Sequence, residues 1–206
     1  MVKTVLMAAS TPSRPNGLRA TSVADLSHIG LQLFFERGFD ETTVDDIAEA
    51  ARIGRRTFFR YFPSKNDLPW GEFDILIDRM RNDLSAVPAE IPMVAALRTA
   101  ILDFNRYPQE ELDYHRKRMQ LLLNVPSLVA HSTLRYASWR AVVAEFAGRR
   151  LGLPETDLGP QVVAWACLAA CLAAYEQWLR LPEKSLLELL DSAMTQLEDV
   201  FGAREP

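Results

Sequence analysis

Residues 42–65 read TTVDDIAEAARIGRRTFFRYFPSK, and this stretch decides the fold. Thr43 and Asp46 have capping-box spacing, which predicts a short helix that begins here and ends near residue 51. An Ile-Gly pair then makes a tight turn, and a second short helix is expected over 55–62, because the proline that follows cannot continue it. Two short helices joined by a tight turn are the plan of a helix-turn-helix.

The charge of this stretch points to a polyanion. Residues 52–65 contain five basic side chains and no acid, although the whole chain of 206 residues has a formal net charge of -4. Clustered arginine and lysine give affinity for DNA by releasing counterions from its phosphates. We therefore interpret the stretch as a DNA-binding surface. The alternative for each single arginine is a solvated surface charge.

Position suggests a role for several of these residues. Arg55 and Arg56 stand at the start of the second helix, where a guanidinium fork can pair with O6 and N7 of guanine. Thr57 and Tyr61 are candidates for contacts with the DNA backbone. Lys65 lies where the next helix is expected to begin, so its ammonium and the free amides can hold one phosphate together. The full set of expected DNA-binding residues is Arg14, Arg19, Thr43, Arg55, Arg56, Thr57, Arg60, Tyr61 and Lys65.

The rest of the chain is expected to be helical as well, so the fold class is all-α. It divides into a flexible arm (1–18), a three-helix helix-turn-helix domain (19–66), called the head below, and a larger helical domain for effector binding and dimerisation (67–206), called the body. At least two of the three phenylalanines beside the arginines are expected to pack inside the head. Ser64 begins another capping box, which predicts one long connecting helix to about Leu84. Further helices are expected near 93–106, 109–124, 127–150, 157–180 and 185–201.

Composition limits the functions that the chain can have. The pI of about 5.5 argues against a protein that coats nucleic acid everywhere. Cys167 and Cys171 lie four residues apart in an apolar run, which indicates reduced thiols in a helix and a cytoplasmic protein. The uncharged stretch 158–175 contains Gly and Pro and is typical of a buried helix, so no membrane span is expected. We find no catalytic, nucleotide-binding or metal-binding motif, and we expect no catalytic residues, no metal and no cofactor.

Residues 22–68 resemble the DNA-binding domain of the TetR family of transcriptional regulators. The matching text is LFFERGFDETTVDDIAEAARIGRRTFFRYFPSKNDL. Arg52 stands where that family usually has Gly, Gly54 replaces the usual Ser or Thr cap, and Arg56 replaces a common Gly or Pro. Phe59 stands where a Tyr often donates its hydroxyl to phosphate, so that contact is not expected here.

The resemblance implies a repressor that binds double-stranded DNA as a homodimer. Its two heads would occupy successive major grooves of a pseudo-palindromic operator, and its body would bind a small-molecule effector. The sequence itself supports dimerisation, because alanines recur every four residues over 166–174 and small residues at this spacing let two helices approach closely. Ordinary packing within one chain is the alternative. The expected dimer interface comprises Ala166, Ala170, Ala173, Ala174, Leu186, Leu190, Ala193 and Leu197.

The effector site is less sharply defined by the sequence. The basic run from His115 to Arg118 precedes an apolar run. A basic cluster at the mouth of an apolar cavity suits an amphiphile with an anionic head and a long tail, such as a fatty acyl-CoA. The alternatives are a solvated helix face for the basic run and plain core packing for the aromatic residues. Candidate effector-binding residues are Phe104, Arg116, Arg118, Met119, Leu122, Leu123, Tyr136, Trp139, Trp165, Tyr175 and Trp178.

Three further segments resemble a narrower branch of the family. SKNDLPWGEFD at 64–74, YHRKRM at 114–119 and AAYEQWL at 173–179 are similar to the regulators that accompany mycofactocin biosynthesis in actinobacteria. This resemblance implies control of a redox-cofactor pathway, with an acyl-CoA as the inducer. Two other classes remain as alternatives, namely a helical enzyme for an apolar substrate and an acyl carrier without DNA function.

Overall fold

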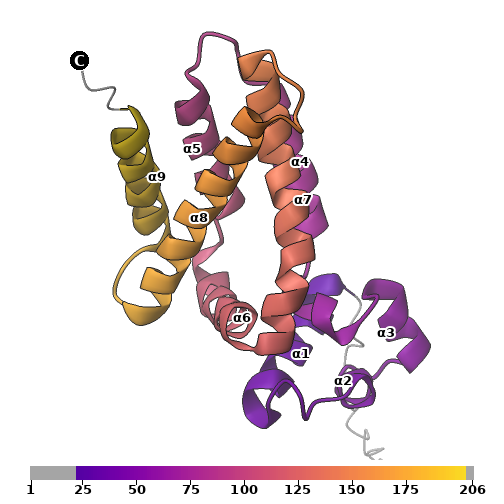
Figure 1. The fold of residues 1–206 in the computed structure, drawn as a ribbon. Helices are drawn as coiled ribbons and strands as arrows, with labels where there is room; N and C mark the ends of the chain where they lie inside the picture. Colours follow the sequence, from indigo (N-terminus) through magenta and orange to yellow (C-terminus); the bar gives the residue numbers. More distant parts are fainter. Residues whose placement is uncertain (1–21, 203–206) are drawn as a thin grey trace, which may run out of the picture.

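The computed structural model describes residues 22–202, which are helical with no strand in that range. The all-α expectation is therefore confirmed. Arg14 and Arg19 lie outside the described residues. In chain order the helices (Figure 1) are α1 (Val23–Arg37), α2 (Val44–Ala50), α3 (Arg55–Tyr61), η1 (Lys65–Trp70), α4 (Phe73–Ser85), α5 (Met93–Phe104), η2 (Gln109–Glu111), α6 (Leu112–Asn124), α7 (Pro126–Leu151), α8 (Leu158–Arg180) and α9 (Leu186–Gly202).

Helices α1 to α3 form the head around an aromatic core. The predicted capping box is present, because Thr43 accepts a hydrogen bond from the backbone N–H of Asp46 while the Asp46 carboxylate accepts from that of Thr43. Phe58 and Ile47 are fully buried, and Phe62 is nearly so. Phe59 is the exposed member of the three phenylalanines. The expectation that at least two of them pack inside the head is confirmed.

The connection from head to body is not the single long helix that the sequence predicts. Ser64 donates its hydroxyl hydrogen to the carboxylate of Asp67 instead of capping a helix, and η1 is a short 3-10 helix that contains Pro69. Gly71 then adopts a positive φ of 53°, which a glycine accepts without strain, before α4 begins. The prediction was wrong here because proline and glycine interrupt the helical hydrogen-bond ladder within one turn of each other.

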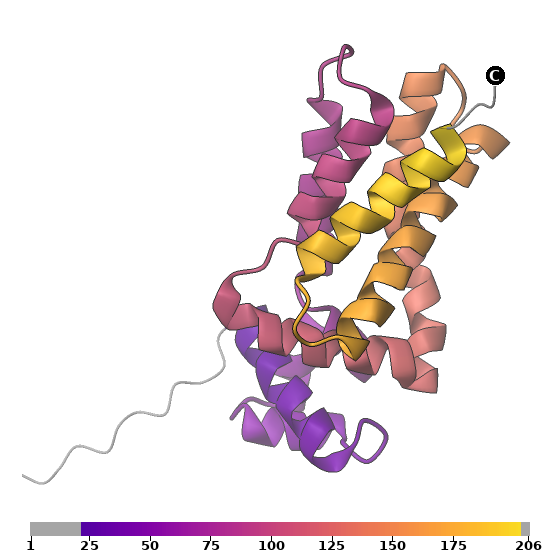
Figure 2. The same cartoon turned by 90° about the vertical axis from the view of Figure 1, so that its left-hand side faces the viewer.

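In the body, α8 packs against α7 on one side and α9 on the other. Helix α6 lies across the junction and contacts both α1 of the head and the long helices of the body, as Figure 2 shows. A bidentate ion pair from Arg98 to Asp191, with both nitrogen–oxygen distances at 2.6 Å, ties α5 to α9. By length and composition alone α8 could cross a membrane, but its place between α7 and α9 is that of a core helix.

Candidate functional site

The first candidate site is the surface at the start of α3. Arg55 and Arg56 are both exposed there. The Arg55 guanidinium lies 2.7 Å from the carboxylate of Asp45 and 5.5 Å from the ring centre of Phe59. Both members of this ion pair are well exposed, so it is weak and Arg55 can exchange Asp45 for another anion. The structure thus places the two predicted base-reading arginines where a ligand outside the protein can reach them.

The neighbouring predicted contacts are arranged less uniformly. The Arg60 guanidinium lies 5.2 Å above the ring of Tyr61, and Arg60 is exposed while Tyr61 and Thr57 are half-buried. The hydroxyl of Thr43 is occupied in the cap of α2, as described above. Arg52, in the turn between α2 and α3, has a positive φ of 55°, which is unusual for a residue with a side chain.

Lys65 does not project as the sequence suggests. Its ammonium donates hydrogen bonds to the carbonyls of Phe39 at 2.7 Å and Thr42 at 2.9 Å, and it lies 4.2 Å from the ring centre of Phe39. Burial lowers the pKa of this ammonium, with Asp40 and Glu41 acting against that shift. Two of the three ammonium hydrogens are therefore used within the head, and the phosphate contact stays a prediction.

The second candidate site is a cavity of about 340 Å³ between the head and the body. This volume lies at the lower end of the range found for small-molecule sites. Its walls come from α1, the η1–α4 connection, α5, α6, α7 and α8. We call this cavity the chamber. Among the predicted effector-binding residues, those that line the chamber are Phe104, Arg118, Met119, Leu122, Tyr136, Trp139 and Tyr175.

Four predicted residues do not line the chamber. Arg116 donates to the carbonyls of Trp178 and Pro182 and lies 4.0 Å from the Trp178 ring centre. Trp178 itself is buried behind His115, and Leu123 is half-buried away from the cavity. Trp165 is 56% exposed, with the Arg140 guanidinium 3.6 Å from its ring centre. Arg118 lines the chamber and Arg116 does not because residues two apart on a helix point about 200° apart.

Other lining residues were missed by the sequence reasoning. Asn105 and Tyr107 belong to the segment that joins α5 to η2, and Trp70 and Glu72 belong to the connection from the head. Connecting segments show no apolar periodicity, so no sequence signal could place these side chains. His115 was expected only as part of the basic run that precedes the apolar residues of α6. Helix α1 also contributes Ala24, Ser27 and His28 to the wall, which links the chamber to the head directly.

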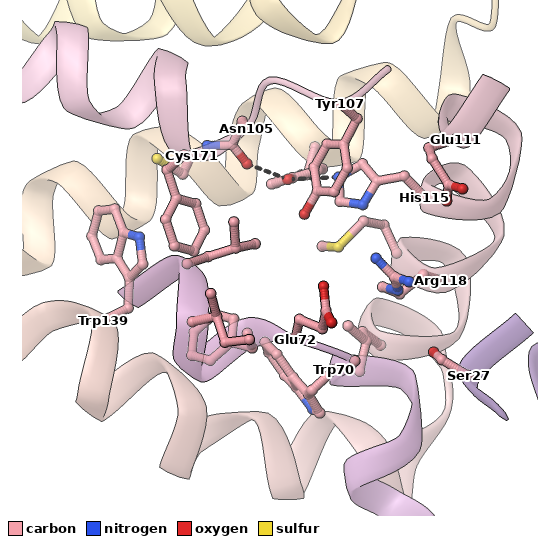
Figure 3. Close-up of a pocket in the computed structure, with 18 of the residues that line it drawn as sticks. Ser27, Trp70, Glu72, Asn105, Tyr107, Glu111, His115, Arg118, Trp139 and Cys171 are labelled. Carbon is pink, nitrogen blue, oxygen red and sulfur yellow. Dashed lines mark hydrogen bonds between the residues drawn. The ribbon is translucent and has the colours of Figure 1, made fainter. Parts of the chain in front are cut away.

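A buried polar relay forms one side of the chamber (Figure 3). The Tyr175 hydroxyl donates to Oδ1 of Asn105, because the amide nitrogen of Asn105 already donates to the carbonyl of Ile101. Nε2 of His115 therefore carries the hydrogen that it shares with the Tyr175 oxygen at 2.9 Å. Burial, assisted by the positive charge of Arg118, lowers the pKa of His115 to about 3, so its ring is neutral. The Tyr107 ring stacks on this imidazole at 3.9 Å between ring centres.

Helix α1 is held against α6 and the connection by specific contacts. Nε2 of His28 lies 3.0 Å from the Glu111 carboxylate, and the His28 ring stacks on Tyr114 at 4.1 Å. Ser27 donates its hydroxyl hydrogen to the carbonyl of Leu68. Leu68 packs so closely on Gly30 that a Cβ there would lie 2.4 Å from it. A ligand that changes this wall of the chamber therefore acts on the first helix of the head.

Asp67 forms a second junction between the head and α7. Its carboxylate accepts hydrogen bonds from Ser64, His131 and Arg135 at 2.7, 3.0 and 2.7 Å. Burial alone would raise the pKa of Asp67, but these hydrogen bonds outweigh it and hold the pKa below its ordinary value. Arg135 also reaches Asp74 of α4, so one guanidinium joins α7 to both parts of the connection.

The predicted dimer interface is only partly on the surface. Leu186 and Leu190 of α9 and Ala174 of α8 are buried within the chain, because α9 packs on α5 and α8. Ala166, Ala170, Ala193 and Leu197 are half-buried, and Ala173 is exposed. Large apolar side chains that the sequence reasoning did not assign to this surface stand out from α8, namely Leu158, Val162 and Trp165.

Comparison with known proteins decides the family. Residues 29–68 match the family model described as bacterial regulatory proteins, tetR family, and residues 91–202 match the MftR C-terminal domain. The chain belongs to the TetR family. It is 44% identical over 191 residues to a protein of Mycobacterium tuberculosis named as a mycofactocin biosynthesis transcriptional regulator, MftR, and the match spans 93% of this chain and 94% of that protein. It is also 28% identical to the regulator TcmR of Streptomyces glaucescens, over 82% of this chain and 80% of that one.

Solved structures share the fold. FadR of Thermus thermophilus, a TetR-family repressor in complex with lauroyl-CoA, superimposes with a TM-score of 0.59 at 22% identity, covering 89% of this chain and 97% of that one. SmeT in complex with triclosan gives a TM-score of 0.61 at 17% identity, covering 86% and 90%. The protein is a DNA-binding transcriptional regulator of the TetR family and not an enzyme.

Proposed function

We propose that the protein is a homodimeric, cytoplasmic repressor of genes for mycofactocin biosynthesis, released from its operator by an effector that occupies the chamber. In this proposal residues 19–66 bind DNA, with help from the arm at 1–18, and residues 67–206 bind the effector and a second copy. The observation that carries the DNA-binding role is the exposure of Arg55 and Arg56 at the start of α3. Each guanidinium can pair with a guanine edge in the major groove, worth about 1–3 kcal/mol.

The operator would be pseudo-palindromic because two copies of the head would be related by the twofold axis of the dimer. Half-sites of such an operator lie one helical turn, roughly 34 Å, apart. The outer face of α8 supports a dimer contact, since Leu158, Val162 and Trp165 are 80%, 55% and 56% exposed in the single chain. Apolar side chains of this size in one patch are typical of a protein interface.

The effector would act through the wall that α1 shares with the chamber. A ligand shifts an equilibrium only by its differential affinity for two conformations. Because Ala24, Ser27 and His28 line the same cavity as Trp139 and Tyr175, a bound molecule contacts the head and the body at once. Its binding energy then depends on how α1 is placed, and α1 places α3.

We propose a fatty acyl-CoA as the effector. The chamber is lined mainly by aromatic and aliphatic side chains, and Arg118 supplies a positive charge at one end. FadR of Thermus thermophilus, which has the same fold, is known in complex with lauroyl-CoA. Arg116 does not take part, so the basic group expected at the mouth is reduced to one arginine.

A mobility-shift experiment tests the proposal. The DNA would be the intergenic region beside the protein's own gene, with salt held constant because phosphate contacts depend on it. We expect retardation at low protein concentration and its loss on addition of lauroyl-CoA, with free coenzyme A as the matched control ligand. Absence of retardation on any nearby intergenic DNA would contradict the proposed operator, and retardation unaffected by the thioester would contradict the proposed effector.

A further inference from the structure

We propose that Arg118 and Tyr107 form a subsite that binds the carbonyl oxygen of an acyl group, at the end of the chamber nearest the head. This inference rests on the proposed function, because it assigns the polar end of the same effector site. It adds a recognition element in the segment between α5 and η2, where Tyr107 lies.

The first argument is the situation of Arg118. Its guanidinium points into the chamber (Figure 3), and its Nη2 would lie 3.6 Å from a Cβ at Gly71. Nε of Arg118 is buried and has no hydrogen-bond partner among the described residues. No carboxylate in the described range lies within 4.0 Å of this guanidinium. Arg118 as a whole is half-buried, but a buried Nε without an acceptor is costly, and an acceptor oxygen from a ligand would relieve that cost.

The second argument is the donor that stands beside it. The Tyr107 hydroxyl is directed into the chamber in Figure 3, near enough to Arg118 that this guanidinium opposes the effect of burial on the pKa of Tyr107. The phenolic hydrogen is then left to donate. An sp² carbonyl oxygen has two lone pairs, so it can accept from Arg118 and Tyr107 together.

The third argument is that the donor pair is held rigidly. Tyr107 stacks on His115, and His115 is fixed through Tyr175 to Asn105. His115 is neutral, as its pKa of about 3 requires, so it adds no second positive charge. Rigid donors lose little conformational freedom when a ligand binds, which makes them effective for recognition.

Charge balance selects between two sources of a carbonyl oxygen. The carboxylate of Glu72 faces the same space as Arg118 in Figure 3. A free carboxylate would add a second negative charge next to Glu72, whereas the carbonyl of a thioester is uncharged. Like charges in one site disfavour each other. The subsite therefore favours an acyl thioester over a free fatty acid.

The rest of the chamber suits the tail of such a ligand. Away from Arg118 the wall is formed by Phe104, Trp139, Leu168 and Leu172, with the uncharged thiol of Cys171. Burial raises the pKa of that thiol well above neutrality, so it behaves as a small apolar group. Each methylene that this wall removes from water adds to the affinity.

A matched pair of ligands tests the subsite in the full-length protein. Lauroyl-CoA and the thioether S-dodecyl-CoA have tails of the same length, and only the first has a carbonyl oxygen. Binding would be followed by quenching of tryptophan fluorescence, since Trp70 and Trp139 line the chamber. We expect the unaltered protein to prefer the thioester by roughly 10-fold, the effect of one to two hydrogen bonds to a charged group.

Variants then assign this preference to the two residues. Arg118→Met should abolish it, Tyr107→Phe should reduce it by about 3-fold, and Arg118→Lys should retain part of it. Lys117→Met is the matched control, because Lys117 is exposed outside the chamber, and it should leave the preference unchanged. The melting temperature of each variant would show that it is folded. Equal affinity of the unaltered protein for both ligands, or a preference that persists in both Arg118 variants, would overturn the subsite.

The same titration distinguishes a thioester carbonyl from a free carboxylate as the bound group. It also distinguishes failure of the Arg118–Tyr107 subsite from failure of the proposed acyl effector. Laurate should bind more weakly than lauroyl-CoA, and Glu72→Gln should raise the affinity for laurate about 3-fold while that for lauroyl-CoA stays constant. Stronger binding of laurate than of the thioester would overturn the charge argument. If both CoA ligands bind equally well, only the subsite fails. If neither binds, the acyl effector proposed above fails with it.

Discussion

The head and the body build their functional surfaces in opposite ways. In the head, Arg55 and Arg56 are exposed and adjacent in sequence, on a helix whose inner face is held by the fully buried Phe58. In the body, the chamber gathers side chains from residue 24 to residue 175, and residues such as Trp139 and Tyr175 are buried core as well as wall. DNA binding can therefore be changed without loss of stability, whereas changes to the chamber affect both stability and ligand binding.

The largest expected effect is a loss of operator binding by the head, with little change in stability. Replacing Arg55 and Arg56 together by alanine should remove specific operator binding, at about 1–3 kcal/mol for each lost bidentate base contact. Stability should change little, because the pair of Arg55 with Asp45 is exposed. Fluorescence anisotropy with operator DNA at fixed salt measures the first quantity and thermal melting the second. Retained operator affinity in the double variant would show that α3 does not read the DNA.

The next largest effect is a pH dependence of stability that comes from His115 in the body. The pKa of His115 is depressed to about 3 in the folded protein, so on acidification the unfolded chain binds the proton first. The free energy of unfolding should then fall as pH drops below about 6.5 towards 3, by about 1.4 kcal/mol per pH unit from this one group. Urea titrations at pH 7.0, 5.5 and 4.5 would measure the slope. A His115→Gln variant should lack this component, and identical slopes for both proteins would contradict the buried neutral ring.

A smaller effect concerns the junction between the two regions. Asp67→Ala removes the acceptor shared by Ser64, His131 and Arg135, and it should destabilise the protein by about 2 kcal/mol. Asp74→Ala is the matched control, because Asp74 pairs with the same Arg135 but its side chain is 77% exposed. The control should cost less than about 1 kcal/mol. Equal losses in urea unfolding would mean that the buried position of Asp67 has no special role.

The smallest expected effect is a change in stability caused by the backbone conformation of Arg52 in the head. Arg52 is held at a φ of 55°, where a glycine is not strained. Arg52→Gly should therefore stabilise the protein by roughly 0.5–1 kcal/mol, whereas Arg56→Gly, inside α3, should destabilise it by about as much. The melting temperatures of the two variants should move in opposite directions. A loss of stability for Arg52→Gly would show that its side chain has an important contact in the turn.

The sequence predicted the structure correctly where interactions within one short stretch determine the conformation. The Thr43–Asp46 cap, the tight turn and the buried face of α3 depend on residues within about 20 positions, and local hydrogen bonds and periodicity determine them. Lys65 shows the limit of this reasoning. Its motif position suggests a phosphate contact, but the carbonyls of Phe39 and Thr42 that hold it come from a different part of the chain.

The chamber could be predicted only in part for the same reason. Helical spacing identified buried positions such as Met119 and Trp139, but it cannot say which buried face meets a cavity. Arg116 and Arg118 face different sides of α6, but the sequence does not say which side meets a cavity. The packing of α6 against α8 places Arg116 on the Trp178 ring and leaves Arg118 in the wall of the chamber. Tyr107 and Glu72 lie in irregular segments, whose side-chain directions depend on the complete fold.

The coupling of the two regions is tested most directly by measuring one affinity in the presence of the other ligand. If an effector in the chamber weakens operator binding by some factor, thermodynamic linkage requires that operator DNA weaken effector binding by the same factor. We would measure the dissociation constant of lauroyl-CoA with and without saturating operator. We expect a higher dissociation constant on DNA, by the factor seen in the converse experiment. An unchanged dissociation constant would show that the chamber, despite its wall of α1 residues, does not control the head.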